Sequence, residues 1–349
     1  MAIESPKPHG GVHAILEEDH PYIFIDTCMQ LWPDADFDNL HRYGVTTYAV
    51  TAWRPHADLD GALQDGMYWH LLARQYDNII LAESVDDIRR AKREGKCALM
   101  IHAQGGDWVG YGLHRIEAMY KLGLRVMLPS YNRSNQICGG GLDREDKGLT
   151  RFGELVVEEC NRVGVVLDCT HTGRQATLEI IERSVVPCVF SHTNPSTFVP
   201  TSRNADDEQI KRLAEKGGVL GMVAWGPLTM PPDNPHWPTV DEFLDMVDYV
   251  CDLTGSTDHI GLSTDMSIGT YPDHWHDPWG EPDYPNFTEA YCEHVTSDVR
   301  SALRALDGFS DYSEIVYVID RMLARNYSEQ DVARFLGENF LRVYGQVWK

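Results

Sequence analysis

A (β/α)8 barrel is the fold class that this sequence predicts, and three features support it. Eight short apolar runs follow one another along the chain, each is continuous rather than alternating, and amphipathic stretches separate them. Continuous apolar runs are typical of parallel strands buried on both faces, and eight alternations of strand and helix are typical of a closed barrel. The predicted strands are 23–26, 45–51, 97–102, 125–129, 164–169, 187–192, 218–224 and 259–264.

Amphipathic stretches predict the helices between these strands. The stretches 151–164 (RFGELVVEECNRVG) and 206–218 (DDEQIKRLAEKGG) place apolar residues at helical spacing and end on glycine, which is favoured just past a helix. No low-complexity linker divides the chain, so residues 1–349 are predicted to form one domain. The C-terminal segment, about 285–349, is helical without further strands, and we expect it to pack on the outside of the barrel. Its predicted helices are 295–306, 312–326 and 328–345.

Composition and charge narrow the possible functions. The chain carries 53 acidic against 30 basic side chains and a formal charge of −23, which argues against a sequence-independent grip on nucleic acid or on an anionic membrane. No apolar run approaches the roughly 18 residues that span a bilayer, and the first residues lack the apolar core of a signal peptide. The eight cysteines are scattered without a CxxC pair. We therefore expect a cytoplasmic protein with reduced thiols and a small-molecule substrate.

Chemically capable side chains follow the predicted strands. In a (β/α)8 barrel the functional groups gather at the carboxyl ends of the strands. Imidazoles and a carboxylate that meet there from different strands are what a zinc site requires, although a single histidine at a strand end is more commonly a hydrogen-bonded wall residue. The residues at these ends are Cys28, Gln30, His102, Gln104, Tyr131, Asn132, Asp168, His171, His192 and Asp265.

Four long stretches make the sequence recognisable. They are LTRFGELVVEECNRVGVVLDCTH (149–171), VFSHTNPSTFVPTSRNADDEQIKRLAEKGGVLGMV (189–223), HIGLSTD (259–265) and YSEQDVARFLGENFLRVYG (327–345). With these stretches the chain resembles the membrane (renal) dipeptidase family, peptidase family M19 of the amidohydrolase superfamily, over nearly its whole length. Function does not follow automatically from such a resemblance.

The resemblance implies a metal-dependent hydrolase that forms a homodimer. Members of this family carry two zinc ions at the barrel mouth and hydrolyse dipeptides, often with a D-residue at the C-terminal position. His171 and His192 match the two histidines that hold the second metal. Asp265 matches the acidic residue that contacts the first metal and handles the proton of the attacking water. Arg203 matches the arginine that receives the substrate carboxylate, a group that a guanidinium binds through two parallel hydrogen bonds.

Four positions depart from the family pattern, and three of them are metal ligands in the family. Cys28 and Gln30 stand where the family has a His-x-Asp pair at the end of the first strand, and Gln104 stands where it has a metal-bridging glutamate. Tyr131, beside Asn132, replaces a histidine that contacts the substrate. The mouth has therefore lost ligands of the first metal, and we interpret it as a remodelled site.

The remaining donors predict a mononuclear site. Two divalent ions bring four positive charges, and a neutral carboxamide cannot bridge them as a carboxylate does. We expect one zinc ion held by His171 and His192, with Asp265, Cys28, Gln104 or water completing its shell. A site without any metal stays open.

Cys28 and His102 each have more than one interpretation. Cys28 is a metal ligand, a packed or substrate-facing thiol, or a covalent nucleophile that needs a nearby base. His102 lies two residues before Gln104, so the alternation of a strand directs both into the barrel. His102 is either an additional ligand or a hydrogen-bonded core residue.

Three functions are compatible with these residues. The first is hydrolysis of a small carboxylate-bearing amide or dipeptide, with Asp265 as proton carrier and with Arg203, Tyr131, Asn132 and Gln104 around the substrate. The second is a non-hydrolytic reaction of a lyase, hydratase or isomerase on the same scaffold, and the third is a catalytically inactive homologue. The aromatic, proline-rich loop 266–287, which contains His274 and His276, is predicted to be a lid or a subunit contact.

Overall fold

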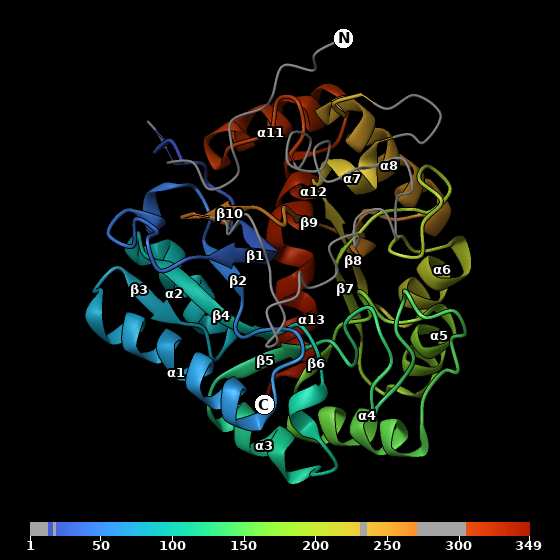
Figure 1. Ribbon diagram of the computed structural model, residues 1–349. Helices are drawn as coiled ribbons and strands as arrows, with labels where there is room; N and C mark the ends of the chain where they lie inside the picture. Colours follow the sequence, from blue (N-terminus) through green and yellow to red (C-terminus); the bar gives the residue numbers. More distant parts are fainter. Residues whose placement is uncertain (1–12, 17–18, 231–235, 271–304) are drawn as a thin grey trace.

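The computed structural model describes residues 13–16, 19–230, 236–270 and 305–349 (Figure 1). Nearly all of the predicted helix 295–306 lies outside these residues, and so do His274 and His276 of the predicted loop 266–287. Within the described part of the chain, no helix combines the length and the apolar character needed to cross a membrane.

Strands and helices alternate along the chain. The strands are β1 (Ile25–Leu31), β2 (Thr47–Thr51), β3 (Ile79–Leu81), β4 (Cys97–Ala103), β5 (Leu124–Met127), β6 (Val166–Leu167), β7 (Val189–Thr193), β8 (Val219–Val223), β9 (Ile260–Ser263) and β10 (Ser267–Ile268). The α-helices are α1 (Leu59–Gln75), α2 (Val85–Glu94), α3 (His114–Lys121), α4 (Arg151–Val163), α5 (Arg174–Arg183), α6 (Asp207–Glu215), α7 (Gly226–Thr229), α8 (Val240–Thr254), α11 (Ile315–Ala324), α12 (Glu329–Ala333) and α13 (Asn339–Val347). A π-helical turn, η5 (Arg334–Glu338), joins α12 to α13.

Eight of these strands form a closed parallel barrel. Parallel pairing runs through β1, β2, β4, β5 and β6, and separately through β7, β8 and β9. A bridge between Asp168 and Val189 joins β6 to β7. The backbone N–H of Asp265 donates to the carbonyl of Cys28 at 2.9 Å and joins β9 to β1, which also pairs with β10. The predicted (β/α)8 barrel is confirmed, and the additional short strand β3 pairs with the start of β4.

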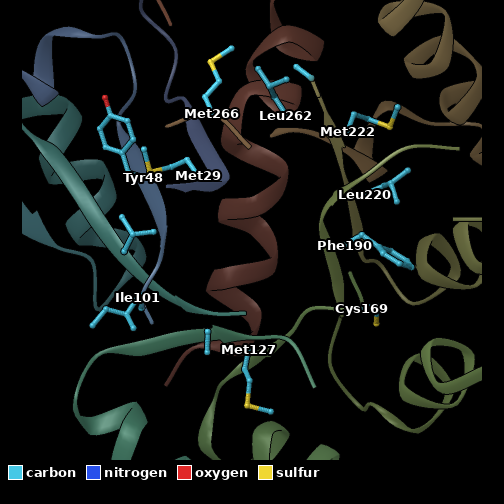
Figure 2. Packing of buried hydrophobic residues seen from close by; sticks show 14 of the residues in the cluster. Met29, Tyr48, Ile101, Met127, Cys169, Phe190, Leu220, Met222, Leu262 and Met266 are labelled. Atoms are coloured by element: carbon cyan, nitrogen blue, oxygen red, sulfur yellow. The ribbon is translucent and has the colours of Figure 1, made fainter. Parts of the chain in front are cut away.

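Apolar side chains form two layers, one inside the barrel and one between the barrel strands and the helices. On β4, Ile101 belongs to the layer between the strands and the helices, whereas Met100 belongs to the layer inside the barrel. Figure 2 shows the outer layer, in which Ile101 and Phe190 point away from the centre of the ring. The same alternation makes His102 and then Gln104 the next inward positions of this strand.

The last helix closes the N-terminal end of the barrel. Phe340 and Tyr344 of α13 share the inner layer with Ile25 and Val219, which stand at the beginnings of their strands. Figure 1 shows α13 in the middle of the ring of strands. From the sequence we expect the C-terminal helices on the outside of the barrel, and α11 does lie beside α8. The position of α13 differs because its apolar face covers inward side chains that would otherwise meet water.

Bulges on two strands turn site residues into the mouth. The pairing register of β1 with β2 shifts between Asp26 and Met29, and the register of β7 with β8 shifts in the same way near the end of β7. A bulge inserts one extra residue and reverses which side chains face inward. Ile25 faces the interior, so strict alternation would turn Cys28 outward. The two bulges therefore place Cys28 and His192 at the mouth.

Candidate active site

Two histidines converge at the carboxyl ends of β6 and β7. His171 follows β6 in a left-handed backbone conformation (φ 62°), and its Nε2 lies 2.8 Å from the Nε2 of His192. On the other side of each ring, His171 Nδ1 lies 2.7 Å from Asn132 Oδ1, and His192 Nδ1 lies 2.6 Å from Ser191 Oγ. Each ring is therefore oriented through its Nδ1, and its Nε2 faces the other histidine.

Burial keeps both imidazoles neutral. It lowers the pKa of His171 and of His192 well below the usual value, and the guanidinium of Arg203 lowers both further. Arg203 is buried, and its Nη2 donates to His171 Nε2 at 3.1 Å. The proton of His171 must then be on Nδ1, which donates to Asn132. Neutral imidazole is the form that ligates metals.

Tyr131 and Asn132 complete this side of the mouth. Asn132 is fully buried in a left-handed conformation (φ 62°). The ring of Tyr131 stacks on the ring of His171, with 4.0 Å between centroids and 23° between planes. The structure thus brings Arg203, Tyr131 and Asn132, three residues predicted to bind substrate, into contact with His171.

A buried carboxylate organises the histidine pair from beneath. Asp168 Oδ1 accepts hydrogen bonds from the Thr170 hydroxyl at 2.7 Å and from the Ser191 N–H at 2.9 Å, and its Oδ2 lies 2.9 Å from His102 Nε2. Burial acts to raise the pKa of Asp168, but the hydrogen bonds and nearby imidazoles hold it below its usual value. His102 is thus hydrogen-bonded in the core through Nε2, whereas its Nδ1 is buried without a hydrogen-bond partner among the described residues, and its role as an additional ligand stays a prediction.

The opposite side of the mouth carries carboxamides. Cys28 and Gln30 lie within β1, which runs past its predicted end at residue 26, because the bulge keeps the strand paired. Gln104 Nε2 donates to Cys28 Sγ at 2.8 Å, and Gln30 Nε2 donates to Asp265 Oδ1 at 2.7 Å. Asp265 adopts a left-handed conformation (φ 51°), and Cys28 Sγ lies 3.9 Å from its Oδ1. The amide groups therefore face the atoms with which Cys28 and Asp265 would hold an ion.

The environment of Cys28 bears on its three interpretations. Burial raises the pKa of the thiol well above its usual value, and the carboxylates of Asp265 and Asp26 raise it further. The thiol is then protonated in the metal-free site, which disfavours a nucleophile, whereas a bound metal ion would itself remove this proton. These contacts favour a packed thiol that faces the site over a nucleophile, and the role of Cys28 as a metal ligand stays a prediction.

A second buried carboxylate supports this side. Asp26 Oδ1 accepts from the backbone N–H groups of Cys28 and Thr264, at 3.3 and 3.0 Å, and its Oδ2 accepts from the Tyr312 hydroxyl at 2.7 Å. Burial raises the pKa of Asp26 to about 6. Neither Asp26 nor Ser191 is among the site residues predicted from the sequence. An aspartate inside an apolar run was the available signal for Asp26, because a buried carboxylate needs several donors.

The donor set fits one metal ion better than two. Among the described residues, no group of three His, Cys, Asp or Glu side chains is arranged to hold a metal. Two ions do not fit as well, because the carboxamides of Gln30 and Gln104 provide no charge, and Gln30 donates to Asp265 while Gln104 donates to Cys28. One ion fits His171 and His192, two neutral imidazoles that are each oriented through the other nitrogen. The Arg203 guanidinium competes with such an ion for the lone pair of His171.

Sequence comparison links the chain to dipeptidases. Residues 39–300 match the family model of membrane dipeptidase (peptidase family M19). Dipeptidase tcpJ from Claviceps purpurea is 26% identical over 273 residues, or 78% of this chain. The chain covers 56% of the length of that relative.

Solved structures share the barrel over almost its whole length. An amidohydrolase from Pseudomonas aeruginosa is 27% identical, with a TM-score of 0.80 over 94% of this chain and 97% of that chain. The probable dipeptidase PvdM from the same organism is 20% identical, with a TM-score of 0.76 over 94% of this chain and 96% of that chain. The latter likeness shows the common fold.

Proposed function

The chain belongs to the membrane dipeptidase family, peptidase family M19, and we propose that it hydrolyses a small amide or dipeptide that carries a free carboxylate. The observation that supports this function is the buried cluster of His171, His192 and Arg203 at the carboxyl ends of the barrel strands. The cluster offers a guanidinium for a carboxylate beside two neutral nitrogen donors. Its counterpart across the mouth is Asp265, an acceptor for the proton of an attacking water.

Each residue has a distinct task in this proposal. Arg203 binds the substrate carboxylate and in doing so releases its hydrogen bond to His171. Asp265 takes a proton from the attacking water, and the amide of Gln30 orients its carboxylate. Tyr131 covers one face of the His171 ring and excludes water from it. Asn132 holds the Nδ1 proton of His171 and thereby keeps the Nε2 lone pair directed into the site.

One zinc ion belongs to this proposal, held by His171 and His192. When bound there, the ion would polarise the scissile carbonyl and lower the pKa of a bound water. We propose a single ion because the opposite side offers a thiol, two carboxamides and only one carboxylate.

The same carboxamides favour a second candidate. A mouth with few anionic ligands also suits a lyase, hydratase or isomerase in which Asp265 removes a proton from carbon. Solvent deuterium incorporated into a carboxylate substrate without net hydrolysis would establish this reaction and would contradict the hydrolase.

Steady-state kinetics of the zinc-supplemented protein test the hydrolase directly. On a panel of dipeptides that includes L-Ala-D-Ala, together with N-acyl amino acids, we expect turnover that Asp265→Asn lowers by about 10³-fold. Arg203→Gln is expected to raise KM for free dipeptides and to leave KM for their C-terminal amides unchanged. Asp252→Asn, at an exposed aspartate, is the matched control. Absence of hydrolysis across the panel would overturn the function.

The partner and location of the chain remain predictions from its sequence. We propose a homodimer and a cytoplasmic location, with a carboxylate-bearing small molecule as the ligand. Light scattering on the full chain tests the oligomeric state, because a monomer at micromolar concentration would contradict the dimer. Cell fractionation tests the location.

A further inference from the structure

Two glycines bring three mouth loops into direct contact. Gly105 follows Gln104 with φ 137°, and a side chain there would overlap the carbonyl oxygen of Pro55 in the loop after β2. A side chain at Gly106 would come within 2.6 Å of the carbonyl oxygen of Pro129, after β5. Only glycine allows these close approaches. The loops after β2, β4 and β5 are therefore packed backbone against backbone.

This packing gathers an imidazole, a carboxylate and an aromatic ring. His56 Nδ1 lies 3.6 Å from Asp107 Oδ2, and Asn135 Nδ2 donates to the same oxygen at 3.3 Å. The His56 ring meets Tyr131 edge-on, with 5.9 Å between centroids and 80° between planes, and Tyr131 in turn stacks on His171. A chain of contacts thus leads from Asp107 to the histidine pair.

The orientation of His56 leaves one nitrogen for a ligand. Nδ1, which faces Asp107, is buried and forms no hydrogen bond within the described part of the chain. The side chain as a whole is 17% exposed, and Nε2, unlike Nδ1, is not among the buried atoms that lack a partner in the described part of the chain. A carboxylate 3.6 Å from Nδ1 favours the charged imidazolium, and an open Nε2 can then act as an acid–base group.

We propose that His56, paired with Asp107, donates a proton to the leaving amine of the substrate. This inference rests on the proposed hydrolytic function and assigns the second proton transfer of the reaction. The water oxygen bonds to the carbonyl carbon while Asp265 takes one proton from the water. The C–N bond then breaks, its electron pair stays on nitrogen, and that nitrogen takes the proton of His56 Nε2. Solvent returns a proton to His56 and removes one from Asp265, so one water is consumed in each turnover.

Substrates with different leaving groups test the proton transfer. A p-nitrophenolate leaves without protonation, whereas an amine does not. We expect His56→Gln to lower kcat about 10²-fold on L-Ala-D-Ala and by less than about 3-fold on the p-nitrophenyl ester of alanine. Asp107→Asn, which removes only the charge beside His56, is expected to lower kcat on the dipeptide about 10-fold. His114→Gln, at an exposed histidine of α3, is the control and should change neither rate. Equal losses on both substrates, or no loss, would overturn the proposal.

A binding measurement separates this proposal from the function on which it rests. We expect the imidazole C–H resonances of His56 to shift when a phosphinate analogue of L-Ala-D-Ala is added to the full chain, and those of His114 to stay in place. If dipeptides are hydrolysed and the His56 resonances do not move, the role proposed for the His56–Asp107 pair (the dyad) is wrong, and the hydrolytic function stands. If neither the dipeptide nor the ester is cleaved, the hydrolytic function fails and the dyad fails with it.

Discussion

The barrel mouth has an imidazole side, at the ends of β6 and β7, and a carboxamide side, at the ends of β1 and β4. The two sides share the same backbone arrangement but carry different functional groups. On each side a bulge turns a site residue inward, and a buried aspartate accepts hydrogen bonds from the backbone at the bulge. The bulges also touch, because the Thr27 hydroxyl donates to the Ser191 carbonyl at 2.6 Å. Asp168 supports neutral imidazoles, whereas Asp26 supports a thiol beside carboxamides. The same bulge and buried aspartate can therefore support different sets of donor atoms.

The two aspartates differ in charge because their donors differ. Imidazole and several N–H and O–H donors hold the pKa of Asp168 below its usual value. The donors of Asp26 only partly offset its burial, so its pKa rises to about 6. The imidazole side therefore packs on Asp168, which stays negatively charged, and the carboxamide side packs on Asp26, which becomes neutral in mild acid.

Removing Asp168 is expected to have the largest effect. Asp168→Ala leaves His102, Thr170 and the Ser191 N–H buried without their acceptor, and we expect a loss of about 3–5 kcal/mol in the free energy of unfolding. Urea denaturation at pH 7 measures it, with Asp252→Ala at the surface as the control. A loss below about 1 kcal/mol would show that Asp168 does not organise this side.

The pH dependence of stability is expected to differ in sign between the two aspartates. The folded state holds the Asp26 proton more tightly than the unfolded state, whose pKa is near 3.8. Asp26 therefore stabilises the fold most below about pH 4, and about 3 kcal/mol is lost as the pH rises through 6. For Asp168, with its lowered pKa, the stabilisation is present above about pH 4 and is lost as the pH falls.

Matched amide variants measure these signs. Free energies of unfolding for wild type, Asp26→Asn and Asp168→Asn are compared between pH 3 and pH 7. The difference between wild type and Asp26→Asn should fall with rising pH, and the difference for Asp168→Asn should rise. Parallel slopes would contradict the contrast between the two sides.

Carboxylates restored to the carboxamide side should add an ion. The double variant Gln30→Asp with Gln104→Glu places two further anions beside Asp265, and oxygen donors of this kind suit divalent ions. We expect its zinc content to rise from about one toward about two ions per chain. The reverse pair, Gln30→Asn with Gln104→Asn, keeps the side neutral and should leave the content unchanged. An unchanged content in the carboxylate variant would show that charge is not what limits this side.

Cys28→Ser is expected to have the smallest effect. A hydroxyl can accept the Gln104 hydrogen bond in place of the sulfur, so stability should change by less than about 1 kcal/mol and kcat by less than about 3-fold. Loss of turnover in Cys28→Ser with an intact fold would make the thiol a nucleophile or ligand.

The eight barrel strands were predictable from sequence because each is covered on both faces and is therefore a continuous apolar run. The length of β1 and its bulge were not, because a bulge depends on the register with β2 rather than on local residue pattern. The position of α13 was missed for a related reason, since one apolar helix face fits the outside or the end of a barrel equally well.

The positions of the candidate site residues were predictable only in part. His171, His192 and Asp265 stand at strand ends, where the fold brings functional groups together. His56 and Asp107 come from the loops after the paired strands β2 and β4, and the close backbone packing at Gly105 brings these loops together. No local pattern marks such a meeting.

The ion content of protein loaded with zinc tests the difference between the two sides most directly. Metal analysis is made on wild type, His171→Ala and Cys28→Ser after removal of excess ion. We expect about one ion per chain in wild type and in Cys28→Ser, and none in His171→Ala. Two ions or none in wild type, or one ion retained in His171→Ala, would contradict a single site on the imidazole side.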